Sequence, residues 1–165
     1  MEQRRFSGLN TRPEDEKETS PQALALSAET PREFCLVENQ QERPPKGLAL
    51  IVEDEIINQM RMERLLRKCG ISCCVATDGH DAINAYLDNT YDLIFMDCRM
   101  PVLDGYTAVH RIRALEQYAE KPTPIIATTG TGNESDCKEA GMDYYLSKPV
   151  LLDNLQEIIE KVLAC

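Results

Sequence analysis

Residues 47–165 alternate between two patterns of hydrophobic and polar positions. Short apolar runs of four to six residues recur, and after each the apolar positions repeat at helical spacing. The run at 93–96 is apolar at every position, which is typical of a strand buried on both faces of a parallel sheet. The pattern predicts five strands, at 48–52, 71–76, 92–96, 124–128 and 143–146. It also predicts five helices, at 56–69, 81–88, 105–118, 134–140 and 152–163.

Strands that alternate with helices of crossover length indicate a parallel sheet with right-handed connections and helices on both faces. We therefore expect a doubly wound α/β domain. Periodicity alone does not fix the strand order. The flavodoxin-like order 2-1-3-4-5 is one of the two common doubly wound patterns, and it is the order that we expect.

Apolar positions within the predicted helices indicate which face of each one is buried. In the first helix these positions predict a buried face, which consists of Ile56, Met60, Leu65, Leu66 and Cys69. In the last helix they predict a buried stripe, which consists of Leu152, Leu155, Ile158, Ile159, Val162 and Leu163.

The first 46 residues differ in composition from the rest of the chain. They contain five prolines and many Glu, Gln, Ser and Thr residues, and they show no sustained strand or helix period. Such a composition buries too little apolar surface to offset the entropy of ordering. We expect residues 1–46 to be a disordered leader or linker and residues 47–165 to be a single domain.

Charge and apolar content exclude several classes of protein. The formal net charge of −10, without a dense basic patch, argues against nucleic-acid binding. No apolar run is long enough to span a membrane, and the amino terminus lacks the apolar core of a secretory signal, so we expect a cytoplasmic protein without a membrane contact.

The cysteines lack the paired spacing of a metal site. We expect them to be reduced and mostly buried, with the two adjacent ones on opposite faces of a strand. The seven are Cys35, Cys69, Cys73, Cys74, Cys98, Cys137 and Cys165.

Polar side chains stand at or just past the ends of four predicted strands. Glu53 and Asp54 follow the first strand, Asp97 the third, Thr129 the fourth and Lys148 the fifth. The carboxyl ends of parallel strands lie along one edge of the sheet, where ligands bind in folds of this class. Three carboxylates held together repel one another unless a cation lies among them. Oxygen ligands of this kind predict Mg²⁺.

Four segments together resemble one family, the receiver domain of two-component response regulators, and the resemblance covers residues 47–165. Segment 50–54 is similar to the family's acidic-pair strand, and 96–105 to its phosphoacceptor loop. Segment 125–130 is similar to the strand that carries the switch hydroxyl, and 141–149 to the strand that leads to the family's lysine. The sequence of the phosphoacceptor loop is similar to that of receivers attached to hybrid sensor histidine kinases.

The resemblance implies that Asp97 accepts a phosphoryl group from a phosphohistidine, donated by a sensor histidine kinase or a histidine phosphotransfer protein. It also implies that Mg²⁺ is held by Glu53, Asp54, Asp97 and the backbone carbonyl of Arg99. A carboxylate is a competent nucleophile for phosphoryl transfer, which needs positioning and charge neutralisation more than proton transfer.

The resemblance further implies that Lys148 pairs with the phosphoryl oxygens and that a cis bond precedes Pro149. Thr129 and Tyr145 would be the switch residues, with the Thr129 hydroxyl bonded to the phosphoryl group. The two histidines, His80 and His110, are expected on exposed helix surfaces rather than in the site.

Several alternatives stay open at this point. The chain ends after the last predicted helix, so we expect a receiver without an output module, which is either a stand-alone protein or a piece of a hybrid kinase. Such a domain is not an enzyme beyond its own phosphorylation and dephosphorylation. A Mg²⁺-dependent phosphohydrolase usually carries a second Asp two residues after its nucleophile, and Arg99 occupies that position here. A phosphorylation-independent interaction module is the remaining alternative, although all the acidic and basic site residues are present.

Overall fold

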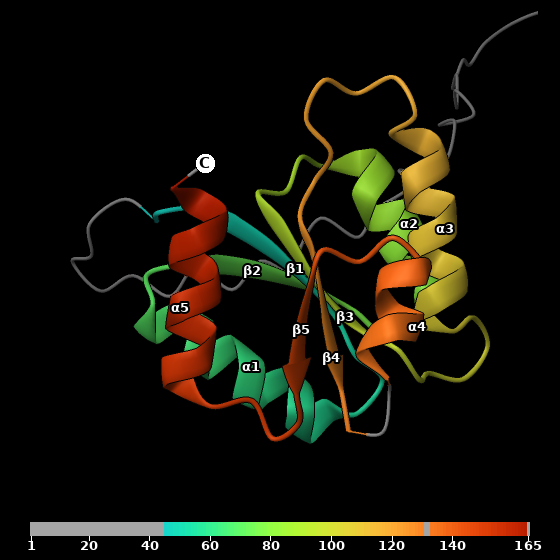
Figure 1. The fold of residues 1–165 in the computed structure, drawn as a ribbon. Helices are drawn as coiled ribbons and strands as arrows, with labels where there is room; N and C mark the ends of the chain where they lie inside the picture. The colour runs from blue at the N-terminus through green and yellow to red at the C-terminus, as the bar shows by residue number, and fades with distance from the viewer. Residues whose placement is uncertain (1–44, 131–132, 165) are drawn as a thin grey trace, which may run out of the picture. The chain divides into compact units, whose positions relative to one another are not determined.

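The computed structural model describes residues 45–130 and 133–164, and all ten predicted elements are present in the predicted order (Figure 1). The strands are β1 (Leu48–Val52), β2 (Ser72–Ala76), β3 (Leu93–Asp97), β4 (Ile125–Thr129) and β5 (Tyr144–Ser147). The helices are α1 (Ile56–Lys68), α2 (Gly79–Asp88), α3 (Gly105–Leu115), α4 (Glu134–Glu139) and α5 (Leu152–Leu163).

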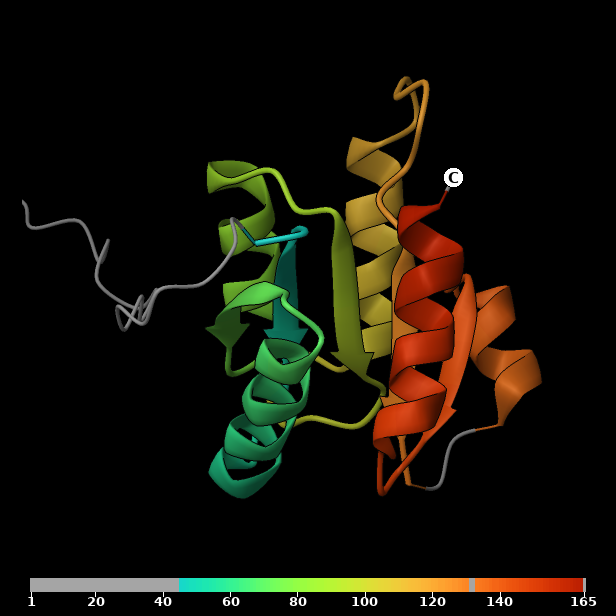
Figure 2. The ribbon, with the colours of Figure 1, turned by 90° about the vertical axis from the view of Figure 1, so that its left-hand side faces the viewer.

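The five strands form one parallel sheet in the order β2-β1-β3-β4-β5, which confirms the expected fold. Val52 pairs with Met96 in the register of β1 and β3, and Asp97 pairs with Thr128 in that of β3 and β4. All strands therefore end at the same edge, and the arrowheads of β1 and β3 point in the same direction in Figure 2. The residues that follow the strands are brought together there.

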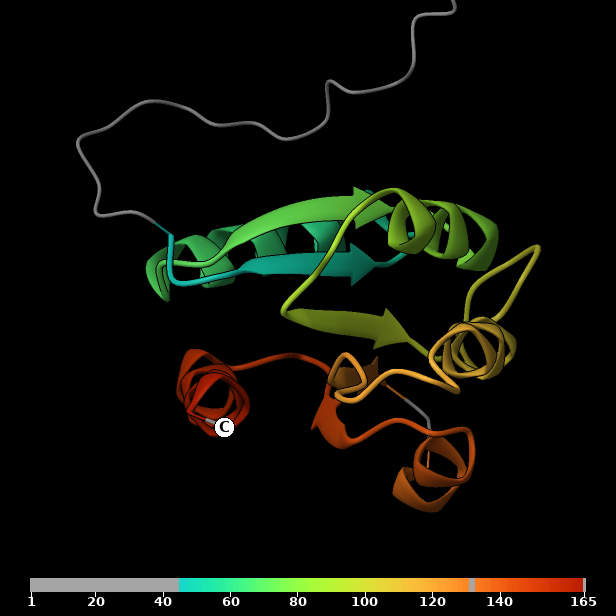
Figure 3. The same cartoon turned by 90° about the horizontal axis from the view of Figure 1, so that it is seen from above.

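Two hydrophobic cores cover the two faces of the sheet. Successive residues of β3 belong to different cores, with Ile94 and Met96 in one and Leu93 and Phe95 in the other. Helices α2, α3 and α4 pack on the first face, and α1 and α5 on the second, as Figure 3 shows from above. Side chains alternate between the two faces of a strand, and both faces of β3 are covered. This explains why the run at 93–96 is apolar at every position.

The predicted buried face of α1 is wrong at its amino-terminal end. Ile56 and Met60 are 69% and 65% exposed, whereas Met62 and Leu66 are buried. Successive residues of a helix are rotated by about 100°, so Met60 lies roughly 200° from Met62 and points away from the sheet. The apolar positions of α1 thus belong to two faces. The buried stripe predicted for α5 is confirmed from Leu155 to Leu163, whose apolar members belong to the second core, while Leu152 is partly buried outside that core.

Two helix ends differ from the prediction by more than one residue, and polar side chains lie at both. Helix α2 begins two residues earlier than predicted, at Gly79, because the Asp78 side chain caps it by accepting hydrogen bonds from the backbone of His80 and Asp81. Helix α3 ends at Leu115 instead of residue 118, and Glu116 directs its carboxylate inward to the backbone N–H of Thr123.

The cysteines of the described residues are reduced, as expected. Cys98 and Cys137 are buried, while Cys69, Cys73 and Cys74 are half-buried. Cys73 and Cys74 pack against opposite cores, as the strand period predicts.

The predicted leader lies outside the described residues except for Pro45 and Lys46, and Cys35 and Cys165 lie outside them as well. The Lys46 backbone N–H donates to the carbonyl of Gly70 at 2.9 Å, so the fold is tied down from about this residue. Within the described part of the chain, no helix is long and apolar enough to cross a membrane.

Candidate functional site

Three carboxylates meet at the carboxyl edge of the sheet. Glu53 and Asp54 follow β1, and Asp97 is the last residue of β3. One oxygen from each lies within 4.8 Å of the others. Glu53 and Asp97 are buried and Asp54 is exposed, so the cluster has a protected base and an open side.

Asp97 is only 6% exposed, and both of its carboxylate oxygens have donors. The Arg99 backbone N–H donates to Oδ1 at 3.0 Å, and the Lys148 ammonium donates to Oδ2 at 2.5 Å. Hydrogen bonds between charged groups are shorter and stronger than those between neutral groups. The carboxylate is thus held in a fixed orientation at the mouth of the sheet.

Lys148 enters the site from the loop after β5 and joins two of the acids. Its Nζ lies 2.6 Å from Glu53 Oε2 in addition to its contact with Asp97. Burial disfavours the ammonium, but the hydrogen bonds and negative charges of Asp97 and Glu53 outweigh it and raise the pKa of Lys148 above its usual value. The lysine is therefore charged at neutral pH.

The backbone around Lys148 is fixed to the neighbouring strand. Its N–H donates to the carbonyl of Thr129 at 3.0 Å, and the bond to Pro149 is cis, as the family resemblance implied.

The loop after Asp97 packs too tightly for a side chain at Gly105. A Cβ there would lie 2.0 Å from the backbone oxygen of Asp97, which no real structure accommodates. Asp104, directly before it, caps α3 by accepting from the Thr107 N–H at 2.8 Å. The Leu103 carbonyl accepts from the Gly79 N–H at 3.1 Å, so the loop is also attached to the first residue of α2. These contacts fix the strand end that carries the carboxylate.

Two residues that sequence reasoning missed hold Glu53 in place. The side-chain amide of Asn58 donates to Glu53 Oε1 at 2.9 Å, and that of Gln59 donates to the Glu53 backbone oxygen at 2.6 Å. Both are in the first two turns of α1. The feature of the sequence that could have predicted these contacts is a pair of amide residues that closely follows the acidic pair.

Thr129 is the last residue of β4, and Tyr145 lies on the neighbouring strand β5. Thr129 is 1% exposed, and its neighbour Thr128 pairs with Asp97 across the sheet. Tyr145 is half-buried and pairs with Ala127, two residues before Thr129. Because side chains alternate along a strand, Thr129 and Tyr145 share the α4 face of the sheet. His80 and His110 are exposed on α2 and α3, outside the site, as expected.

The carboxylate cluster suits a hard divalent cation. Its donors are oxygens only, one side is open to solvent, and Glu53, Asp54 and Asp97 are close enough to share one ion. Mg²⁺ takes a few carboxylates and keeps several waters, so the donor set fits it.

The sequence profile of the family described as the response regulator receiver domain matches residues 49–160. The chain belongs to this family. Receivers are signalling domains of two-component and phosphorelay systems, and receivers pair with histidine kinases or phosphotransfer proteins.

Relatives of this receiver include much longer proteins. Hybrid signal transduction protein dokA of Dictyostelium discoideum is 38% identical over 119 residues, which are 72% of this chain and 7% of that protein. Probable histidine kinase 2 of Oryza sativa subsp. indica is 33% identical over an alignment of 144 positions, which covers 76% of this chain and 14% of that protein. The chain therefore spans a small part of the length of these curated relatives.

Solved receivers share the fold. The receiver domain of a sensor histidine kinase from Pseudomonas aeruginosa PAO1, with a magnesium ion coordinated in its active site cleft, is 39% identical. Its TM-score is 0.66, and the match covers 72% of this chain and 98% of that one. In a second structure, a receiver domain from Saccharomyces cerevisiae is bound to a histidine phosphotransfer signalling protein. The match to this structure is 34% identical with a TM-score of 0.67 and covers 74% of this chain and 92% of that one.

Proposed function

We propose that Asp97 accepts a phosphoryl group from a phosphohistidine of a sensor kinase or phosphotransfer protein. The observation that carries the proposal is the environment of the Asp97 carboxylate, which is buried at a strand end, oriented by Arg99 N–H and Lys148, and flanked by two further acids. The resemblance of the surrounding loops and the family membership of the chain support it.

An Asp97 oxygen forms the new bond to phosphorus while the bond from phosphorus to the histidine nitrogen breaks, and the electron pair stays on the imidazole. An ionised carboxylate needs no base to activate it. The Lys148 ammonium, which now neutralises Asp97, pairs with the phosphoryl oxygens as charge moves onto them. The hydroxyl of Thr129 donates to another phosphoryl oxygen.

Glu53, Asp54, Asp97 and the Arg99 carbonyl would hold Mg²⁺, and the ion neutralises the negative charge of the phosphoryl group when it is bound. The Arg99 N–H already donates to Asp97 Oδ1, so the peptide of residue 99 lies at the edge of the cluster. Asn58 and Gln59 orient Glu53 for this role by their hydrogen bonds to it.

The docking face for the phosphohistidine partner is formed by exposed apolar side chains around the acidic cluster. Ile57 and Met60 of α1 are 76% and 65% exposed, Val102 in the loop after β3 is 82% exposed, and Leu151 after β5 is 55% exposed. All of them follow strands that end at the site. Exposed apolar side chains gathered at one edge favour a protein–protein contact, and the yeast complex of a receiver with a phosphotransfer protein is a precedent.

The remaining parts of the proposal concern the whole chain. We assign residues 47–165 to the receiver and residues 1–46 to a leader or linker, and we place the protein in the cytoplasm. The domain acts as a phosphoryl-controlled binding partner or relay, and its chemistry is limited to its own phosphorylation and dephosphorylation.

The test is incubation of the full chain with acetyl phosphate and Mg²⁺, followed by intact mass measurement. We expect one phosphoryl group per chain, no labelling in Asp97→Asn, and no labelling in excess chelator. Asp88→Asn, on the exposed end of α2, is the matched control and should be labelled like the wild type. Full labelling of Asp97→Asn would reject the assignment, and equal labelling rates with chelator would reject the role of the cation.

A further inference from the structure

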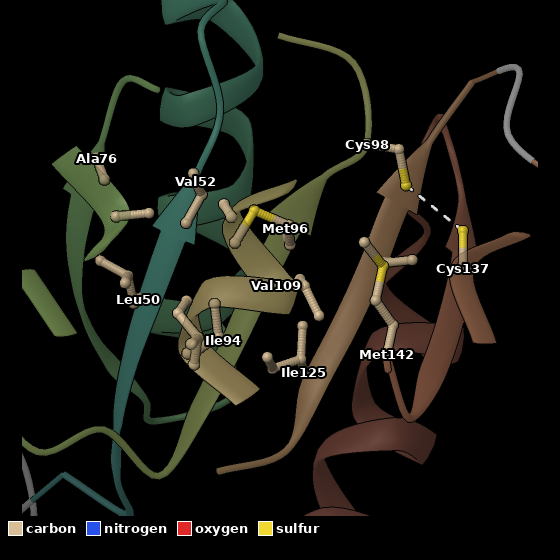
Figure 4. Close-up of a cluster of buried hydrophobic side chains, with 14 of the residues drawn as sticks. Leu50, Val52, Ala76, Ile94, Met96, Cys98, Val109, Ile125, Cys137 and Met142 are labelled. Carbon is tan, nitrogen blue, oxygen red and sulfur yellow. Dashed lines mark hydrogen bonds between the residues drawn. The ribbon is translucent and has the colours of Figure 1, made fainter. Parts of the chain in front are cut away.

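Two thiols meet directly beside the phosphoacceptor. Cys98 is the residue after Asp97 and is 0% exposed, and Cys137 is on α4 and is 2% exposed. Their sulfur atoms are 3.4 Å apart, as the dashed line in Figure 4 marks. The residues are 39 positions apart in the sequence and come from different elements. A disulfide requires sulfurs at about 2.05 Å, so a small shift of α4 is sufficient to join them.

We propose that Cys98 and Cys137 form a reversible disulfide when the domain meets a hydroperoxide, and that this disulfide slows phosphorylation of Asp97. The second half of the inference rests on the proposed function, whereas the first half does not. In a reducing compartment, disulfides are usually transient and serve redox sensing or catalysis.

The oxidation of the two thiols is balanced by the reduction of the peroxide. The Cys137 sulfur attacks one peroxide oxygen, the O–O bond breaks, and Cys137 becomes a sulfenic acid while one water is released. The Cys98 sulfur then attacks the Cys137 sulfur, the S–O bond breaks, and a second water leaves. The two thiols lose two electrons and two protons, and hydrogen peroxide is reduced to two waters.

Access of peroxide to these sulfurs is controlled by α4. Both thiols are buried. A peroxide therefore reaches the sulfurs only when α4 moves away. This helix has six residues, and its only buried side chain is Cys137. A short helix with so little buried surface opens at a low free-energy cost compared with the sheet.

The disulfide would act on the site through the backbone of the phosphoacceptor loop. The Cys98 carbonyl accepts from the Gly105 N–H at 3.3 Å, and the next N–H, that of Arg99, holds Asp97. A covalent link from Cys98 to α4 moves this peptide segment and prevents α4 from shifting. Both effects oppose the rearrangement that phosphorylation requires.

The experiment oxidises the full chain with hydrogen peroxide, with and without a low urea concentration that loosens α4, and maps cross-linked peptides before and after dithiothreitol. We expect a peptide pair that joins positions 98 and 137, formed faster in urea and lost on reduction. Its absence under both conditions would overturn the proposal, whatever the outcome for Asp97.

The regulatory half is tested by phosphorylation with acetyl phosphate. We expect the oxidised wild type to be labelled at least threefold more slowly than the reduced form, with recovery after dithiothreitol. Cys137→Ala should not respond to peroxide, whereas Cys74→Ala, which alters a half-buried thiol of the same core, should respond like the wild type. A cross-linked protein that is labelled at the reduced rate would contradict the regulatory half. Failure of the reduced protein to be labelled at all would instead reject the proposed function.

Discussion

At the scale of single residues, the site depends on how the Asp97 carboxylate is held. Its two oxygens receive one backbone N–H and one ammonium, and the same ammonium bridges to Glu53. The pKa of Lys148 is raised because the two acids outweigh the effect of burial. Lys148 therefore stays charged throughout the neutral range.

A mutation of Arg99 tests whether its side chain affects the lifetime of the phosphoryl group. Its side chain is exposed beside Asp97, and a guanidinium can donate two hydrogen bonds to a phosphoryl group or keep water away. We expect Arg99→Ala to shorten the phosphoryl lifetime roughly three- to tenfold, which corresponds to the loss of one solvent-exposed hydrogen bond of roughly 0.5–1.5 kcal/mol. Decay of the phosphorylated mass after removal of acetyl phosphate measures this lifetime.

Arg111→Ala, an exposed arginine of α3, is the matched control for Arg99 and should decay at the wild-type rate. An unchanged decay rate in Arg99→Ala would remove its side chain from the mechanism.

At the scale of elements, a charged network fixes α3, β4 and β5 at the edge of the sheet opposite the site. Arg113 donates to Glu116 at 2.5 Å, to the Gly141 carbonyl at 2.9 Å and to Asp143 at 2.7 Å. Glu116 is buried and also accepts from the hydroxyl of Tyr86 at 2.7 Å. The network joins α2 and α3 to the turn before β5.

Glu116 should make stability depend on pH. Burial alone would raise its pKa, but the hydrogen bonds from Thr123 N–H, Tyr86 and Arg113 outweigh burial and lower the pKa below its usual value. A carboxylate with a lowered folded-state pKa contributes stability above its unfolded pKa of about 4.5, and this contribution is lost as the pH falls through the folded value. Urea unfolding should show Glu116→Gln less stable than the wild type by roughly 1–3 kcal/mol at neutral pH.

The difference between Glu116→Gln and the wild type should shrink as the pH falls below about 4.5. Glu120→Gln, at an exposed position, should show neither effect. A stability difference that is constant from neutral to acid pH would show that the charge of Glu116 is not involved.

The α4, β5 and α5 face should carry the output of phosphorylation. Thr129 and Tyr145 lie in the adjacent strands β4 and β5, on the face of the sheet that α4 covers. A charge-assisted hydrogen bond from Thr129 to the phosphoryl group, worth roughly 1.5–3 kcal/mol, shifts a two-state equilibrium by about one to two decades. We expect Tyr145 to fill the volume behind Thr129 when Thr129 moves toward Asp97. Amide shifts on phosphorylation should therefore spread over residues 133–155 in the wild type and be much reduced in Thr129→Ala.

Thr123→Ala removes a hydroxyl near Tyr86 at the opposite edge of the sheet and should leave the response of the output face intact. Equal responses in wild type and Thr129→Ala would disprove the proposed coupling without affecting Asp97 as acceptor.

Much of the fold and of the site could be predicted, because the carboxyl ends of parallel strands lie at the same edge of the sheet. Apolar runs identify β1, β3 and the first three residues of β4, and the polar residues beside Asp97 follow from the geometry of a parallel sheet. The exposed face of α1 could not be predicted, because Ile56 and Met60 have the same hydrophobicity as residues of a core stripe. The contacts of Arg113 and the meeting of Cys98 with Cys137 join distant positions, and no local pattern specifies them.

At the scale of the whole molecule, exposed apolar side chains lie in the segments that follow the strands ending at the site, and we propose that the phosphohistidine partner docks on them. We expect Ile57→Asp to slow transfer from a phosphorylated histidine phosphotransfer protein at least tenfold, because it places a charge in the contact. Ile57 is 76% exposed and is not one of the site acids, so labelling by acetyl phosphate should be unchanged. Leu87→Asp, an exposed apolar position on α2, is the matched control and should transfer normally. Equal losses with both phosphoryl donors would indicate damage to the fold instead of the docking face.

The central claim is that phosphate is carried by the Asp97 carboxylate as an acyl phosphate. The most direct measurement is to phosphorylate the reduced full chain with acetyl phosphate, treat it with borohydride, and sequence its peptides by mass spectrometry. Borohydride converts an aspartyl phosphate to homoserine and leaves free aspartates unchanged. We predict homoserine at position 97 and no reduced side chain at the neighbouring acids Glu53, Asp54 and Asp104. Homoserine at another position, or labelled protein with an intact aspartate at 97, would contradict it.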